Sequence, residues 1–339
     1  METNRPAIIS ATPAAEDLDD PSDPPETELR QCRVDVGQHG QRLDKILADT
    51  ISEFSRSYLQ QLVEQGAVEV NGRRSSKNSV RLKAGDRLLV ALRPTAQSQA
   101  FRPEAMALDV VFEDAHLLVI HKPAGLVVHP APGNWSGTLL NGLLARDPGL
   151  HALPRAGIVH RLDKDTSGLM LVARSRAAMD ALIRMIAQRT VQRQYLALVH
   201  KRWSGPSPRD VHAALGRDPA NRLRMAVVDA QRSGAKEAWT TVELLANTDA
   251  GCLVRCSLHT GRTHQIRVHM ASIGHPLVGD ATYGGAVGAG MRRQALHAFR
   301  LALPHPVLER TLEFVAPLPP DLVDALALWG LRYNRPDSA

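Results

Sequence analysis

A dense polar segment between two apolar segments constrains the fold of this chain more than any other feature. Residues 157–172 read GIVHRLDKDTSGLMLV, so an isoleucine–valine pair precedes a polar run, and large apolar residues follow Gly168. This pattern is typical of a loop held between two buried strands, where a rigid scaffold places reactive side chains. We therefore expect two core strands with a functional loop between them.

The chain from residue 108 onward alternates between strand-like and helix-like patterns. The predicted strands are 109–112, 117–121, 169–173, 194–200, 240–245, 253–258, 298–303 and 311–315, and the predicted helices are 138–146, 176–188, 264–272 and 320–328. This order lacks a regular β-α-β rhythm, which favours an α+β domain with a mixed, largely antiparallel central sheet.

Composition changes twice before residue 108. Residues 1–30 contain five prolines, eight acidic and two basic side chains, and we interpret this segment as a disordered acidic tail. Because the chain carries +6 and the tail −6, residues 31–339 carry +12, which indicates a polyanionic partner. Charge alone also fits a basic protein without such a partner. Residues 96–107 show no periodicity, and we interpret them as a linker.

Residues 31–95 have the pattern of a small α+β module. The predicted order is a helix over 41–51, a helix between Ser55 and Gly66, a strand over 68–70, a tight turn at 71–72 and a strand over 88–92. The segments RLDKIL, SRSYLQQLVEQGAVEVNG and GDRLLV resemble the S4 RNA-binding domain. That domain presents basic side chains to folded RNA, and the matching positions here are Arg56, Arg73, Arg74, Lys77 and Arg81. A solvated charged surface is the alternative.

The polar loop itself offers several reactive groups. These are two carboxylates, two hydroxyls and two cations, namely Asp163, Asp165, Thr166, Ser167, Arg161 and Lys164. The residues alone allow a nucleophilic carboxylate, a carboxylate-bound metal or a salt-bridged turn.

Five motifs in sequence order resemble the RluA/RluD family of pseudouridine synthases. They are IHKPAGLVVHPAPGNWSGTLLNGLL (120–144), HRLDKDTSGLMLVAR (160–174), VQRQYLALV (191–199), LHTGRTHQIRVHMASIGHPLVGDATYG (258–284) and RQALHAFRLALPHP (293–306). The leader PAGLVVHPAPGN leans toward the RluD-like branch, whose target is large-subunit ribosomal RNA. The resemblance implies an isomerase that converts uridines in 23S ribosomal RNA to pseudouridine, with a catalytic domain over 108–335 and no cofactor.

The resemblance also implies site residues. Asp163 matches the catalytic aspartate, with Asp165 as the rival carboxylate in the loop. Arg267 matches the arginine that pairs with this aspartate. A neighbouring guanidinium keeps a carboxylate ionised, which is the role expected of this arginine. Tyr195 matches the tyrosine that packs against the target base. The reaction detaches uracil from ribose and rejoins it through carbon, which requires a group acting at C1′ or C2′ and no redox cofactor.

Two further residues have expected roles at the substrate. Arg161 matches the arginine that fills the gap left by an extruded base. Extrusion is required because C1′ and C5 are inaccessible inside a paired helix. Leu296 is expected to close the apolar side of the uracil pocket.

No metal site is expected. His259, His264 and His269 recur every five residues, but this step does not place side chains on one helix face, and no HExxH pattern is present. We expect these histidines to hold loops or to contact phosphate. The three cysteines cannot all pair and are expected to be reduced thiols.

Location and partners follow from the remaining features. No apolar run is long enough to span a bilayer and no secretory signal pattern begins the chain, so we expect a cytoplasmic protein. The expected partner is large-subunit ribosomal RNA or the assembling large subunit, bound by a monomer.

Three other functions are weighed. A binding-only S4 protein would have lost Asp163, Tyr195 or Arg267, and all three are present. A metal-dependent RNA hydrolase would need a third acidic ligand beside Asp163 and Asp165, which no comparable motif offers. The same isomerisation of transfer RNA or of another ribosomal site remains open.

Overall fold

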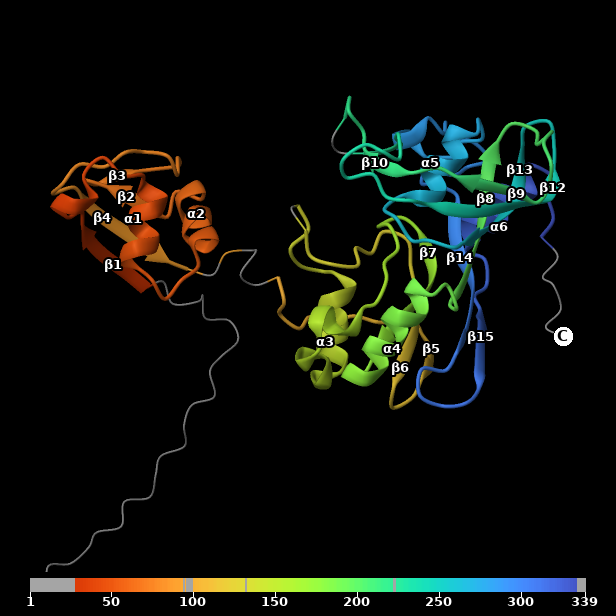
Figure 1. Ribbon diagram of the computed structural model, residues 1–339, viewed down its shortest axis with the longest axis horizontal. Coiled ribbons are helices and arrows are strands. Elements are labelled where there is room, and N and C mark those ends of the chain that lie inside the picture. Colours follow the sequence, from red (N-terminus) through yellow and green to blue (C-terminus); the bar gives the residue numbers. More distant parts are fainter. Residues whose placement is uncertain (1–27, 94, 96–99, 132, 222–223, 334–339) are drawn as a thin grey trace, which may run out of the picture. The chain divides into compact units, whose positions relative to one another are not determined.

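The computed structural model describes residues 28–93, 95, 100–131, 133–221 and 224–333. The chain divides into two compact units, one up to residue 98 and one from residue 99 (Figure 1). Each unit has its own hydrophobic core and is described by itself.

The N-terminal unit is a small α+β fold. Its described elements are β1 (Glu28–Arg33), α1 (Leu43–Thr50), α2 (Arg56–Glu64), β2 (Val68–Val70), β3 (Arg73–Arg74) and β4 (Arg87–Leu92). The antiparallel sheet has the order β1-β4-β2-β3. Ser55 caps α2 as predicted, since its hydroxyl accepts a hydrogen bond from the Tyr58 amide. Asn71 and Gly72 both have positive φ, which confirms the predicted tight turn.

Two predicted boundaries are wrong. The predicted tail over 1–30 includes Glu28–Arg30, which form the start of β1 and pair with β4. The sequence ELRQCR conceals this strand because its side chains lie at an edge and are largely exposed. Residues 1–27 of the tail lie outside the described residues. The predicted linker over 96–107 is too long, because the Asn141 amide donates hydrogen bonds to the carbonyls of Ala100 and Arg102.

The C-terminal unit is built on a large sheet. Its described strands are β5 (Val110–Glu113), β6 (Leu117–Lys122), β7 (Ser167–Ala173), β8 (Gln192–His200), β9 (Arg209–His212), β10 (Leu215–Arg217), β11 (Met225–Val227), β12 (Trp239–Asn247), β13 (Gly251–Leu258), β14 (Leu296–Pro304) and β15 (Thr311–Val315). Its described helices are α3 (Leu139–Arg146), α4 (Arg176–Ala187), α5 (Gln265–Ser272) and α6 (Pro320–Leu328). All predicted strands and helices of this unit are confirmed, with ends shifted by two residues at most.

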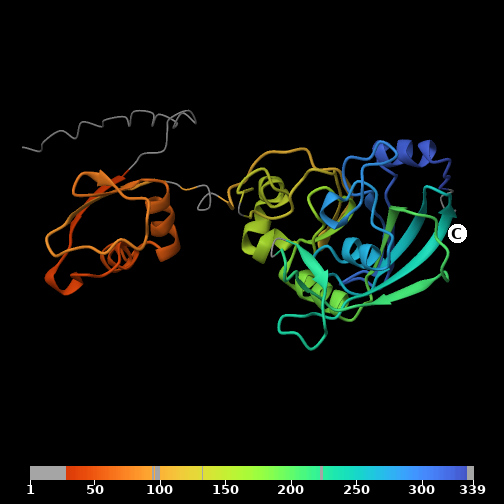
Figure 2. The same cartoon turned by 90° about the horizontal axis from the view of Figure 1, so that it is seen from above.

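Among the described residues the main sheet has the order β5-β6-β7-β14-β8-β13-β12-β9, with β15 added to β14. Every pairing is antiparallel except that of β7 with β14, so the predicted mixed, largely antiparallel sheet is confirmed. Figure 2 shows this sheet from above, with helices packed along it. No helix within the described ranges is long and apolar enough to cross a membrane.

Side-chain alternation along β8 gives the sheet two faces. Tyr195, Ala197 and Val199 pack into the main core together with α3 and α4. Leu196 and Leu198 point the other way and pack against α6. Leu162 of the polar loop belongs to the same core as Tyr195, so Tyr195 is directed to the side of the sheet on which this loop lies.

The parallel contact between β7 and β14 is short, with His297 opposite Ser167 and Ala298 opposite Gly168. Gly168 has φ of 121°, and a Cβ atom there would lie 2.3 Å from the Ala298 carbonyl oxygen. Only glycine permits this approach of the two backbones. The polar loop enters β7 at this point, next to the centre of the sheet.

Candidate active site

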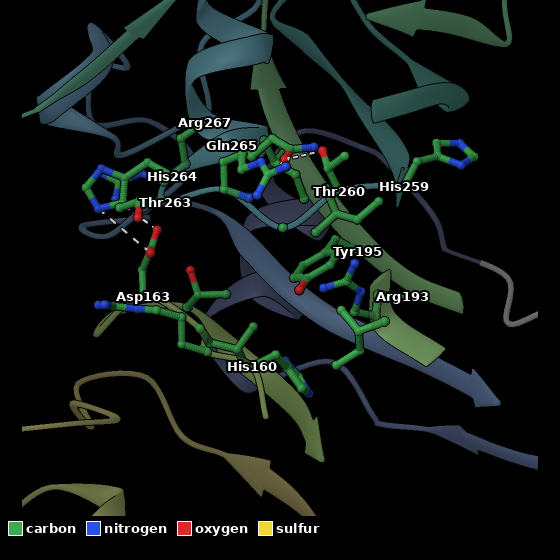
Figure 3. Close-up of a pocket in the computed structure, with 18 of the residues that line it drawn as sticks. His160, Asp163, Arg193, Tyr195, His259, Thr260, Thr263, His264, Gln265 and Arg267 are labelled. Carbon is green, nitrogen blue, oxygen red and sulfur yellow. Dashed lines mark hydrogen bonds and ion pairs between the residues drawn. The ribbon is translucent and has the colours of Figure 1, made fainter. Parts of the chain in front are cut away.

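A cavity of about 510 Å³ lies between the polar loop, β8 and the segment that leads into α5 (Figure 3). All five residues predicted to act on the substrate line it, namely Arg161, Asp163, Tyr195, Arg267 and Leu296. These residues come from four separate motifs, and the sheet brings them together. The volume suits a small group such as a nucleobase with its sugar.

Asp163 and Arg267 form the predicted pair. The Arg267 Nη1 atom donates a hydrogen bond of 3.1 Å to Asp163 Oδ2. The same guanidinium donates from Nε and Nη2 to both carboxylate oxygens of Asp280, at 2.7 and 2.8 Å. Burial alone would lower the pKa of Arg267, but the Asp280 and Asp163 carboxylates raise it above its ordinary value. Asp280 therefore fixes the guanidinium that faces Asp163.

His264 lies on the other side of the Asp163 carboxylate. Its Nε2 atom is 3.8 Å from Asp163 Oδ1, and its Nδ1 atom is 2.7 Å from the Tyr283 hydroxyl. That hydroxyl also accepts a hydrogen bond from the Met225 amide, which fixes its position beside the His264 ring. Burial lowers the pKa of His264, which favours the neutral ring, and its Nε2 edge faces Asp163.

Lys122 fixes the polar loop through hydrogen bonds to backbone carbonyls. This lysine is fully buried, and its ammonium group donates to the carbonyls of Pro123, Leu126 and Lys164 at 2.8 to 2.9 Å. Burial lowers the pKa of Lys122 to about 8, while the neighbouring Asp165 and Asp163 carboxylates oppose this shift. One side chain thus ties the end of β6 to the residue after Asp163.

Tyr195 forms the wall of the cavity between Asp163 and Arg193 (Figure 3). Its side chain is buried, and burial raises the pKa of its hydroxyl to about 12. The phenol is therefore un-ionised at neutral pH. Leu296 is buried beside it, at the start of β14.

A second cavity of about 570 Å³ adjoins the first, and the two share Arg161, Asp163, His264 and Arg267. Its other charged lining residues are four cations and two carboxylates, namely Lys164, Arg224, Arg292, Arg293, Asp165 and Asp280. Arg161 is exposed and borders both cavities. The catalytic carboxylate candidate thus lies between a nucleobase-sized cavity and a cationic one, which suits a polyanionic substrate.

The predicted RNA-binding residues of the N-terminal unit fall into two groups. Arg73, Arg74 and Lys77 are exposed around the turn between β2 and β3 and the following loop. Arg56 donates a hydrogen bond of 2.8 Å to Asp44, which is fully buried, and Arg81 donates to the Gly40 carbonyl. Arg56 and Arg81 therefore also hold the fold of this unit.

The histidines singled out by their spacing do not converge. His269 is buried and contacts the Thr240 hydroxyl and the Ala213 carbonyl, so it holds two segments together as expected. His259 stacks on Trp239 with ring centroids 3.6 Å apart. Among the described residues no group of three or more His, Cys, Asp or Glu side chains could hold a metal ion. The three cysteines are free thiols.

The arrangement can perform carboxylate chemistry on a bound nucleoside. A guanidinium orients the Asp163 carboxylate, an imidazole flanks it, and an aromatic ring in the same cavity can stack on a flat base. Motif matching assigned no role to Asp280, Lys122 or Tyr283, although Lys122 lies in the motif over 120–144 and the other two lie in the motif over 258–284.

Comparisons with known proteins agree with this geometry. Residues 116–272 match the family model described as RNA pseudouridylate synthase, and residues 41–88 match the S4 domain. The chain belongs to the RNA pseudouridine synthase family and is an enzyme of that class.

Individual relatives place the chain within that family. A Neisseria meningitidis protein named ribosomal large subunit pseudouridine synthase D is 47% identical over 89% of this chain and 83% of its own length. A Xylella fastidiosa protein of the same name is 45% identical over 88% of this chain and 92% of its own. These matches confirm the resemblance to the RluD-like branch.

A solved structure agrees with the fold. The human protein RNA pseudouridylate synthase domain containing 4 superposes with a TM-score of 0.54 at 26% identity. The superposition covers 67% of this chain and 95% of the human one.

Proposed function

We propose that this protein converts specific uridines of large-subunit ribosomal RNA into pseudouridine in the cavity around Asp163. The observation that carries the proposal is the Asp163 carboxylate, held at 3.1 Å by Arg267 inside a cavity walled by Tyr195. The choice of ribosomal RNA is supported by relatives that are named for the large subunit and align over most of their length.

Each cavity residue has a proposed role. Asp163 acts on the ribose, either by attack at C1′ or by removal of the C2′ proton. Arg267 holds the Asp163 carboxylate in its orientation, and the Tyr195 ring stacks on the uracil. Leu296 closes the apolar side, and Arg161 occupies the space vacated by the extruded base.

The two units divide the work in this proposal. The S4 domain, proposed over residues 31–95, anchors folded RNA through exposed cations such as Arg73 and Lys77. The catalytic domain extracts and isomerises the uridine. We propose that a monomer acts in the cytoplasm on free ribosomal RNA or on the assembling large subunit.

The test of substrate is tritium release from uridine labelled at C5, because that proton leaves when the base rejoins through C5. Transcripts of large-subunit RNA, small-subunit RNA and transfer RNA are compared with the full-length chain. We expect release from the large-subunit transcript alone. Release only from transfer RNA or small-subunit RNA would overturn the ribosomal assignment and keep the isomerase.

A further inference from the structure

A second arginine reaches into the cavity, and the roles proposed above do not use it. Arg193 lies on β8 two residues before Tyr195, so both side chains point to the same face of the sheet. Arg193 lines the cavity and is only 6% exposed. Figure 3 shows the two side chains adjacent, with Tyr195 between Arg193 and Asp163.

The guanidinium of Arg193 is buried without a counter-charge. Among the described residues no carboxylate forms an ion pair with it and no acceptor bonds to it, and its buried Nε atom lacks a hydrogen-bond partner. Arg267, in the same cavity, is paired with two carboxylates. Burial lowers the pKa of Arg193, yet a guanidinium stays protonated at neutral pH. A buried charge of this kind requires a partner, and the open side of Arg193 is the cavity.

The opposite wall makes room for this side chain. A Cβ atom on Gly261 would lie 2.8 Å from the Arg193 Nη1 atom. The φ angle of Gly261 is outside the left-handed region, so its backbone does not itself require glycine. The absence of a side chain at Gly261, in the loop before α5, therefore leaves the space that the guanidinium occupies.

The chemistry of the reaction supplies the missing partner, on the basis of the function proposed above. When the C1′–N1 bond breaks, its electron pair goes to N1 and is delocalised onto O2 and O4 of the detached uracil. The uracil carries this negative charge if an Asp163–C1′ bond forms at the same time. It also carries this charge if Asp163 takes the C2′ proton and a C1′–C2′ double bond forms. C5 then bonds to C1′ as the Asp163–C1′ bond breaks or, in the second route, as C2′ takes its proton back from Asp163. The C5 proton leaves, and N1 gains a proton.

We propose that Arg193 is a further catalytic residue, which contacts a uracil carbonyl oxygen and stabilises the negative charge of the detached base. A base stacked on Tyr195 lies within reach, because side chains two residues apart on a strand are about 7 Å apart. Asp163 then faces the sugar and Arg193 the far side of the base. A fixed cation in a desolvated cavity stabilises developing charge strongly. Phosphates suit the exposed cations at the rim, such as Arg161 and Lys164.

The test uses single-turnover rates at saturating RNA, on whichever transcript the wild-type chain modifies. Arg193→Gln is expected to slow tritium release about 100-fold or more, with Arg193→Lys in between. Arg189→Gln is the matched control, because Arg189 lines the same cavity but is exposed, and only RNA affinity is expected to change. Without RNA, Arg193→Gln should melt no lower than wild type, since it removes a desolvated charge.

A better leaving group separates charge stabilisation from structure. In RNA that contains 5-fluorouridine, fluorine stabilises the uracil anion, so Arg193→Gln should slow consumption of the fluorinated nucleoside much less than it slows turnover of uridine. Equal slowing of both bases would overturn the proposal in favour of a structural role. An unchanged saturating rate with weaker RNA binding would overturn it in favour of a phosphate contact.

Gly261→Ala offers an independent route to the same side chain. It should slow the wild type by displacing Arg193, but should not slow Arg193→Gln further. Additive losses would contradict the proposal. Asp163→Asn is measured beside these variants. Turnover by Asp163→Asn would contradict the proposed function itself, whatever the Arg193 variants show.

Discussion

The Asp163 carboxylate lies within a chain of paired charges. Asp163 faces Arg267, which Asp280 holds through two hydrogen bonds, and Asp280 is almost fully buried. Asp280 does not line the cavity that contains Tyr195, so it cannot contact a nucleobase bound there. Asp280 is therefore a positioning residue for Arg267.

Replacement of Asp280 tests this assignment. Asp280→Asn removes the charge and replaces one of the two acceptor oxygens by a donor, so the guanidinium is no longer fixed where it faces Asp163. We expect the single-turnover rate to fall about 100-fold, which is the effect of displacing a catalytic group by about 1 Å. RNA affinity should stay unchanged. We also expect a loss of about 3 kcal/mol in the free energy of unfolding. A rate equal to wild type would show that Asp163 does not need this anchor.

The site was predictable from sequence only where a motif carried it. The order of motifs placed Asp163, Tyr195 and Arg267 correctly in one cavity. Nothing in the sequence pairs Lys122 with the Lys164 carbonyl, 42 residues away, because that contact depends on how the strands are ordered. Arg193 was likewise hidden, since an arginine two residues from a tyrosine on a strand has no distinctive pattern.

At the scale of elements, the polar loop is positioned by its two ends. The end of β6 supplies Lys122, whose ammonium group bonds three carbonyls, and the start of β7 supplies Gly168. Both contacts involve backbone atoms, so the loop keeps its shape whatever its own side chains contact. These contacts explain how a polar loop can hold a carboxylate in place.

Loss of the lysine should loosen that loop. Lys122→Met keeps the length of the side chain but leaves three carbonyls without a donor. We expect the free energy of unfolding to fall by about 3 kcal/mol or more and the turnover rate to fall with it. Lys201→Met, at an exposed position, should change stability by about 0.5 kcal/mol at most. Denaturant unfolding compares the two variants, and equal stabilities would contradict the role of Lys122.

The turn between β5 and β6 is held by another carboxylate. Burial would raise the pKa of Asp114, but the amides of His116 and Leu117 and the His305 ring together lower it to about 2. His305 lies beyond the end of β14, so Asp114 also joins this turn to the β14–β15 connection.

Acid should remove the contribution of the Asp114 carboxylate to the free energy of unfolding. Because the folded pKa is below the unfolded value of about 4, the stabilisation is present above pH 4 and disappears as the pH falls to 2. Asp114→Asn should therefore cost about 2 kcal/mol at pH 7 and progressively less below pH 4. Urea unfolding of both proteins at several pH values measures the difference. A difference that stays constant with pH would mean that the carboxylate charge is not the cause.

The fold was predictable where strands are long and apolar. Strands such as β8 and β13 alternate or run apolar over many residues, and their predicted ends were nearly right. The short strands β9, β10 and β11 were missed, since three or four residues give no readable period, and among the described strands of similar length in the C-terminal unit only β5 was predicted. The insertion of β14 between β7 and β8 was also beyond prediction, because pairing over such separations is set by the whole core.

At the scale of the whole molecule, binding and chemistry are proposed to reside in different units. The S4 unit offers exposed cations near the β2–β3 turn, whereas Arg56 is tied to the buried Asp44. The two kinds of arginine should therefore respond differently to mutation, although sequence alone grouped them together.

Salt dependence distinguishes these arginines. The triple change of Arg73, Arg74 and Lys77 to Gln should weaken RNA binding and reduce the slope of log affinity against log salt by about 2 to 3. Arg56→Gln should instead lower the melting temperature of the unit and leave most of the slope. Filter binding at several salt concentrations provides the slopes. An unchanged slope in the triple variant would mean that the phosphates bind elsewhere.

The most direct test of the whole account compares the two carboxylates of the loop. Tritium release from large-subunit RNA labelled at uridine C5 is followed for wild type, Asp163→Asn and Asp165→Asn, with RNA affinity measured alongside. The account predicts no release from Asp163→Asn at near-normal affinity, because the change removes charge and not bulk, and substantial release from Asp165→Asn. Turnover by Asp163→Asn, or its loss only in Asp165→Asn, would contradict the central claim.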